Sequence, residues 1–92
     1  MEGDLMAGKY SSARVVPWDG KGNRYAVRID PSTYEETYLV RYSPNEKPHY
    51  GKWTGTEWEE SVAAFDAFYD DVWFDDLTEA EAREKFPEAF AN

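Results

Sequence analysis

The chain has 92 residues, with 19 acidic and 10 basic side chains, one histidine and no cysteine, so its formal net charge is −9. This length supports one small domain and excludes a large enzyme fold. Leu, Ile, Val and Phe are few, but four Trp, seven Tyr and five Phe bring large apolar areas, so we expect a folded single domain.

Extended segments dominate the first part of the chain. After eight residues without a sustained period, Arg24–Asp30 and Thr37–Ser43 alternate apolar and polar positions, as half-buried strands do. Ala13–Trp18 is rich in β-forming residues and Pro17 favours a sheet edge for it, while His49–Trp53 is a fourth candidate strand. Turn-forming residues separate these segments. The sequence therefore predicts an antiparallel meander of three or four strands over about residues 10 to 54.

A helical period follows Gly55. Five apolar residues recur at spacings that place them on one stripe of a helix. They are Val62, Phe65, Tyr69, Val72 and Trp73. We expect a main helix from about residue 61 to 74, with this stripe packed on one face of the sheet.

The start of the main helix has two readings. Thr56 with Glu59 has the spacing of a capping box, whereas a short hairpin over Trp53–Trp58 leaves Ser61 as the cap. The later start is preferred.

A second, shorter helix is predicted at about residues 79 to 86. Thr78 with Glu81 has capping-box spacing, and Pro87 closes the segment. The expected fold class is α+β, with a β meander over about residues 10 to 54 and an acidic helical part over residues 55 to 92.

The negative charge belongs to the helical part. Residues 1 to 56 hold eight basic and seven acidic side chains, or plus 1, whereas residues 57 to 92 hold two basic and twelve acidic ones, or minus 10. No Lys or Arg lies between Glu57 and Asp76. Like charges four residues apart destabilise a helix by about 0.2–0.5 kcal/mol per pair, and solubility alone needs less charge of mixed sign. The tolerated repulsion indicates a positively charged partner.

Carboxylates four residues apart on a helix are separated by about 6 Å, close to the spacing of successive phosphates in a nucleic-acid strand. We therefore expect a non-enzymatic inhibitor or modulator whose acidic helical face fills the basic groove of a nucleic-acid-binding protein. Phe74 is either an aromatic anchor on that face or a core residue. The predicted partner-binding residues are Glu59, Glu60, Asp66, Asp70, Asp71, Phe74, Asp75 and Asp76. In composition this profile is similar to small acidic proteins of mobile genetic elements, such as anti-CRISPR and anti-restriction proteins; no motif is shared, and no residue role follows from the likeness.

Other readings stay open at this point. The acids can form a solvated face, or they can pair with Arg24, Arg28 and Arg41 on the sheet, although those residues are nearly balanced within their own half. The alternative function is a generic interaction or structural module that binds through its sheet edge or aromatic surface. Direct nucleic-acid binding is disfavoured because phosphates would face a carboxylate field.

Groups for catalysis are few. His49 is the single histidine, Gly20, Lys21 and Gly22 lack the spacing of a phosphate loop, and the acids lack the spacing of a calcium loop. We expect no catalytic residue, no cofactor and no resident metal. The lack of cysteine favours a reducing cytoplasm, and the longest uninterrupted aliphatic or aromatic run, Val62–Phe65, is too short to cross a membrane.

Overall fold

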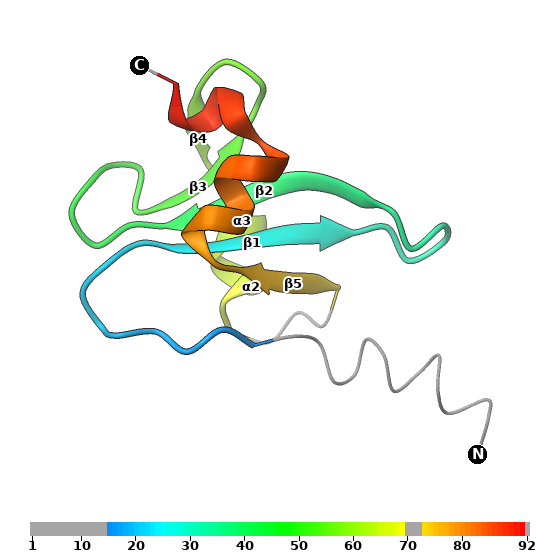
Figure 1. Ribbon diagram of the computed structural model, residues 1–92, viewed down its shortest axis with the longest axis horizontal. Coiled ribbons are helices and arrows are strands. Elements are labelled where there is room, and N and C mark those ends of the chain that lie inside the picture. The colour runs from blue at the N-terminus through cyan, green and yellow to red at the C-terminus, as the bar shows by residue number, and fades with distance from the viewer. Residues whose placement is uncertain (1–14, 70–72, 92) are drawn as a thin grey trace.

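Five antiparallel strands form one sheet in the computed structural model, which describes residues 15–69 and 73–91 (Figure 1). The strands are β1 (Arg24–Ile29), β2 (Glu36–Tyr42), β3 (Tyr50–Trp53), β4 (Trp58–Glu60) and β5 (Phe74–Leu77), in the spatial order β4-β3-β2-β1-β5. The helices are α2 (Val62–Ala67), α3 (Glu79–Lys85) and a 3₁₀ helix, η1 (Pro87–Phe90). The α+β class, with an antiparallel sheet and C-terminal helices, is confirmed, and the sheet has one strand more than the upper expectation.

Different helices cover the two faces of the sheet. Alternation along β1 sends Tyr25, Val27 and Ile29 to one face, where they pack with Ala82 of α3. Ala26 points to the opposite face and packs with Ala64 of α2. Figure 1 accordingly places α3 in front of the sheet and α2 behind it. We call these the α3 face and the α2 face.

Small side chains let α2 lie close to the sheet. Ala64 is fully buried, and Ala63 and Ala67 also pack against the cluster on the α2 face. Aromatic side chains fill much of the space there already, since the rings of Tyr38 and Phe74 meet edge to face at 6.2 Å. The volume that remains suits alanine rather than a larger residue.

Both helix starts use the predicted caps. The Ser61 hydroxyl accepts a hydrogen bond from the backbone N–H of Ala63 at 3.1 Å, so the later start of the first helix is confirmed. Thr78 and Glu81 form the predicted capping box, with reciprocal hydrogen bonds of 3.1 and 2.9 Å. These contacts satisfy N–H groups that a helix leaves without intrahelical partners.

The hairpin reading of the segment before α2 is confirmed. Trp53 and Trp58 are cross-strand partners of β3 and β4, and their rings lie 5.4 Å apart. The turn between them places Gly55 at a φ of 106°, a conformation that a side chain disfavours.

The predicted main helix is too long. Its last turn in the structure ends at Ala67, and the segment Phe74–Leu77 is strand β5, which pairs with β1 at the edge of the sheet. A strand suits this segment because it sends Asp75 and Asp76 to opposite faces, whereas a helix would hold the acids of the segment near one another. Residues 70–72 lie outside the described part of the chain.

The predicted edge strand over Ala13–Trp18 is also wrong where it can be judged. Residues 15–18 form no strand, and residues 13 and 14 lie outside the described range. The backbone N–H of Val16 donates to the carboxylate of Asp76 at 2.9 Å, and Pro17 has no N–H to donate. A side-chain contact therefore holds this segment in place of a strand ladder.

Candidate functional site

Helix α2 turns its large apolar residues toward solvent. Val62 is 76% exposed, Phe65 45% and Tyr69, just beyond the helix, 64%, whereas Ala64 is 0% exposed. These three residues of the predicted core stripe are thus exposed, because the alanine side of the helix packs on the sheet instead. Of the other two, Val72 lies outside the described residues, and Trp73 is partly buried against the cluster on the α3 face. A group of exposed large apolar residues on one element marks an interaction site more often than scattered ones do.

Rings from the sheet extend this exposed group. Tyr42 and Tyr50 lie 4.9 Å apart, Tyr50 meets Phe65 edge to face at 5.1 Å, and Phe65 stacks on Tyr69 at 4.5 Å with an interplanar angle of 24°. We call Tyr42, Tyr50, Val62, Phe65 and Tyr69 the α2 aromatic surface. Its rings are fixed by mutual contact, so they form a prearranged surface and not a set of independent side chains.

A hydrogen bond joins two hydroxyls on this surface. The Tyr50 and Tyr69 oxygens are 3.0 Å apart. This hydrogen bond, together with a smaller contribution from burial, raises the pKa of Tyr50 to about 12. The Tyr50 phenol is therefore neutral at physiological pH, and the hydroxyl pair ties the chain just beyond α2 to β3.

Three of the predicted partner-binding acids lie on α2 or on the strand just before it. Asp66 follows Phe65 on α2 and is partly exposed. Glu59 and Glu60 are exposed on β4, directly before the Ser61 cap of the helix. The register pairs Glu59 with Lys52 and Glu60 with Gly51, so the Glu59 side chain lies on the α2 face of the sheet and the Glu60 side chain on the α3 face. These acids make no ion pair within residues 15–69 and 73–91.

The remaining predicted residues lie elsewhere. Asp70 and Asp71 fall outside the described part of the chain, although they follow Tyr69 directly in the sequence. Phe74, Asp75 and Asp76 are on β5, at the edge of the sheet opposite β4. Four strand spacings separate these edges, about 19 Å. The described acids therefore do not form one helical face.

Two of the predicted partner-binding residues on β5 are buried. Phe74 is 3% exposed and belongs to the core of the α2 face, so it is no anchor on the flank of an acidic surface. Asp76 is 8% exposed, accepts from the Val16 N–H and lies 3.8 Å from the Arg24 guanidinium. Pairing of one acid with a sheet arginine, which the charge balance argued against, does occur here.

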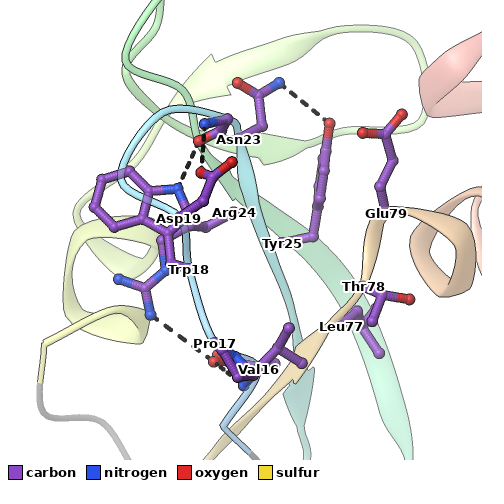
Figure 2. Close-up of a pocket in the computed structure, with 12 residues that line it drawn as sticks. Val16, Pro17, Trp18, Asp19, Asn23, Arg24, Tyr25, Leu77, Thr78 and Glu79 are labelled. Atoms are coloured by element: carbon purple, nitrogen blue, oxygen red, sulfur yellow. Dashed lines mark hydrogen bonds and ion pairs between the residues drawn. The ribbon is translucent and has the colours of Figure 1, made fainter.

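A polar cavity of about 350 Å³ lies between the segment Val16–Asn23 and the junction of β5 with α3 (Figure 2). Its polar groups are used within the protein. The Trp18 indole N–H donates to the Gly22 carbonyl at 2.7 Å, and the Asn23 amide donates to the Tyr25 hydroxyl at 3.2 Å. On the opposite wall Glu79 pairs with Arg83. The cavity therefore lies where the segment Val16–Asn23 is attached to the sheet.

Asp19 closes the turn at one end of that segment. Its carboxylate accepts from the N–H groups of Gly22 and Lys21, and these hydrogen bonds hold the pKa of Asp19 below its ordinary value. The carboxylate thus serves as a turn cap.

The α3 face contains a buried cation. Arg41 is 6% exposed and its guanidinium lies 4.3 Å from the ring centre of Trp58. One terminal nitrogen is 3.3 Å from the Glu46 carboxylate, while Nε has no hydrogen-bond partner in the described structure. The other terminal nitrogen donates to the Pro48 carbonyl at 3.5 Å, so aromatic packing, one carboxylate and one carbonyl hold this charge in the core.

Cations on aromatic rings recur through the described part of the chain. Six such contacts have distances of 4.3 to 5.5 Å, namely Arg24 with Trp18 and with Phe68, Arg28 with Phe74, Arg41 with Trp58, Lys52 with Tyr38, and Arg83 with Phe90. None of them uses Tyr50, Phe65 or Tyr69. The exposed rings at the end of α2 are thus those without a cation from the described residues.

His49 lies just before β3, and its Nδ1 is 2.8 Å from the carbonyl oxygen of Ser43, which makes Nδ1 the protonated nitrogen.

Over the described ranges, no three His, Cys, Asp or Glu side chains are grouped so as to hold a metal ion. No helix within those ranges is long and apolar enough to cross a membrane.

Comparison with protein-family models, curated proteins and solved structures gave no match.

Proposed function

We propose that this chain is a non-enzymatic, cytoplasmic protein-binding module that docks onto a basic protein through the α2 aromatic surface. The observation that carries the proposal is the exposure of Val62, Phe65 and Tyr69 on one side of a short helix whose opposite side is buried. Aromatic side chains dominate the energy of protein interfaces, and those held by their neighbours lose little entropy on binding.

Charge selects a basic partner over a second copy of the chain. The net charge is −9, so two copies would meet as like charges. Glu59 is on the α2 face and Asp66 is on α2 itself, and a partner rich in Lys and Arg would be drawn toward them. The proposed interface therefore has an aromatic centre and an acidic border.

Nucleic-acid-binding proteins are the class that most often presents such basic grooves. Docking in a groove of this kind would displace the nucleic acid, which is how an inhibitor would act. The support for this role is charge and aromatic exposure. Regular phosphate-like spacing does not support it, because α2 carries one acid, Asp66, and Asp76 is buried on β5.

The test compares two valines that are both 76% exposed. Val62→Arg places a bulky cation in the α2 aromatic surface, and Val15→Arg makes the same charge change in the segment before β1. Each variant and the wild type would be used to capture proteins from an extract of the source cells, and the captured protein would then be purified and titrated at low and high salt.

A basic protein that binds wild type and Val15→Arg alike, loses at least about tenfold in affinity for Val62→Arg, and weakens steeply with salt is the expected result. Equal binding by Val62→Arg would refute the assignment of the surface. A concentration-dependent dimer in size-exclusion chromatography with light scattering, abolished by Val62→Arg, would make the occupant a second copy and overturn the basic partner.

A further inference from the structure

The protein contains a filled example of how it holds a guanidinium group. The Arg24 guanidinium lies 5.5 Å from the ring centre of Trp18 and 4.9 Å from that of Phe68, with the Asp76 carboxylate 3.8 Å away. Two rings and one carboxylate thus surround one planar cation. Stacking on rings and pairing with a carboxylate are the two interactions that favour Arg.

Among the described residues, the same elements recur at the end of α2 without a cation. Phe65 and Tyr69 stack at 4.5 Å, and the edge-to-face contact with Tyr50 fixes the orientation of Phe65. Asp66 supplies the carboxylate. The Tyr69 backbone N–H donates to the Asp66 carbonyl at 3.1 Å, which closes a turn between two residues three positions apart, a spacing at which side chains are neighbours.

From this correspondence we propose that Tyr50, Phe65, Asp66 and Tyr69 form a seat for an arginine side chain of the partner. The inference rests on the proposed function, because it names the group that the α2 aromatic surface recognises. The guanidinium stacks on the exposed rings, and its N–H groups face the Asp66 carboxylate.

Arginine suits the seat better than lysine. A planar guanidinium covers the face of a ring while its edge donates in a fork to a carboxylate, whereas a lysine ammonium is a compact and strongly hydrated charge. The hydroxyls of Tyr50 and Tyr69, 3.0 Å apart, add oxygen acceptors at the border of the seat. A preference for arginine over lysine therefore distinguishes binding at this seat from electrostatic attraction, which both residues would share.

The experiment uses the full chain, labelled with ¹⁵N, and three peptides that differ at one residue type. Each peptide carries three arginines, three lysines or three citrullines in the same Gly and Ser background. Amide shift changes locate the contact and give the dissociation constant. The variants are Tyr69→Leu, which keeps apolar area and removes the aromatic face, and Asp66→Asn, with Glu57→Gln as a control that removes one exposed acid from the β3–β4 turn.

The arginine peptide should perturb the amides around Phe65 and Tyr69 and bind about threefold or more tightly than the lysine peptide, while the citrulline peptide should not bind. Tyr69→Leu should abolish the preference for arginine. Asp66→Asn should weaken the arginine peptide more than Glu57→Gln does.

Equal affinity for arginine and lysine peptides, unchanged by Tyr69→Leu, would overturn the arginine seat. If Val62→Arg still removed binding of both peptides, the α2 aromatic surface would remain the docking site and the proposed function would stand. Shift changes confined to other surfaces, with Val62→Arg without effect, would overturn both.

Discussion

Two substitutions on α2 should have opposite effects on stability from those that residue size suggests. Val62→Ala should leave the free energy of unfolding nearly unchanged, and Ala64→Val should lower it. Val62 is 76% exposed, so about a quarter of its side chain is removed from water. Full burial of a valine contributes about 1.5–3 kcal/mol, and a quarter of that is about 0.4–0.7 kcal/mol. Alanine regains about 0.5 kcal/mol through its higher helix propensity. Val62→Ala should therefore change the free energy of unfolding by less than about 0.5 kcal/mol.

Ala64 has the opposite position, since it is 0% exposed between α2 and the sheet. Two added methyl groups would be forced against a packed surface, which typically costs about 1–3 kcal/mol. Urea unfolding followed by tryptophan fluorescence measures both variants, and an unchanged slope against urea concentration shows that the two states being compared are the same.

The refuting result is equally specific. If the Val62 side of α2 were core, Val62→Ala would remove two buried methyl groups and cost about 2 kcal/mol or more. A loss above about 1.5 kcal/mol for Val62→Ala, or a neutral Ala64→Val, would mean that α2 packs with its other side on the sheet. The α2 aromatic surface would then not exist.

Three further predictions concern single contacts. The raised pKa of Tyr50, about 12 against an ordinary 10.0, gives a stabilising contribution that is complete below pH 10 and is lost as the pH rises toward 12. Tyr69→Phe removes the hydroxyl partner and should move the Tyr50 transition in tyrosinate absorbance back toward pH 10. An unmoved transition would show that the hydroxyl pair is not formed. Thr78→Ala should lower the free energy of unfolding by about 1 kcal/mol through loss of the capping box, and a change near zero would argue against that box. Glu46→Ala leaves the buried guanidinium of Arg41 without its carboxylate and should lower the free energy of unfolding by about 1 kcal/mol or more. Arg41→Met keeps the packing on the Trp58 indole, so its free energy of unfolding should stay within about 1 kcal/mol of wild type. A larger loss for Arg41→Met than for Glu46→Ala in urea unfolding would contradict this account.

The strands and caps were predictable because their signals are local. Alternation over Arg24–Asp30 and Thr37–Ser43 identified β1 and β2 to within one residue at either end. Capping-box spacing at Thr78, and the hydroxyl of Ser61, marked both helix starts. Each of these features depends on residues that are close in sequence, so periodicity and spacing are sufficient.

The end of the first helix and the burial of its stripe depend on distant residues. β5 exists because the outer edge of β1 accepts a strand there, and the sequence of Phe74–Leu77 alone does not contain that information. Likewise, the alanine side of α2 is buried because Tyr38, Phe74 and their neighbours already fill the α2 face. Alanines at 63, 64 and 67 were the signal for this packing, but a stripe of larger apolar residues outweighed them.

The residues of the candidate site also depend on distant contacts. Phe74 and Asp76 were assigned to one acidic helical surface, whereas strand β5 buries both. Glu59 and Asp66 are at least partly exposed on β4 and α2, and their binding role stays a prediction. The charge pattern shows where acids concentrate along the chain, but not which face of the fold each one reaches.

The path of the chain from β4 to β5 has a consequence for the order of folding. β1 to β4 are neighbours in both sequence and space, whereas β5 reaches β1 only after α2 has crossed the sheet (Figure 1). Long-range pairing forms late because closing a long loop costs entropy before any contact compensates for it. We therefore expect the amides of β5 to exchange with solvent before those of β1 to β3 in native-state hydrogen exchange. A ligand that holds α2 in place would slow the amide exchange of β5. Binding at the α2 aromatic surface could therefore be measured at an edge strand that the ligand does not contact.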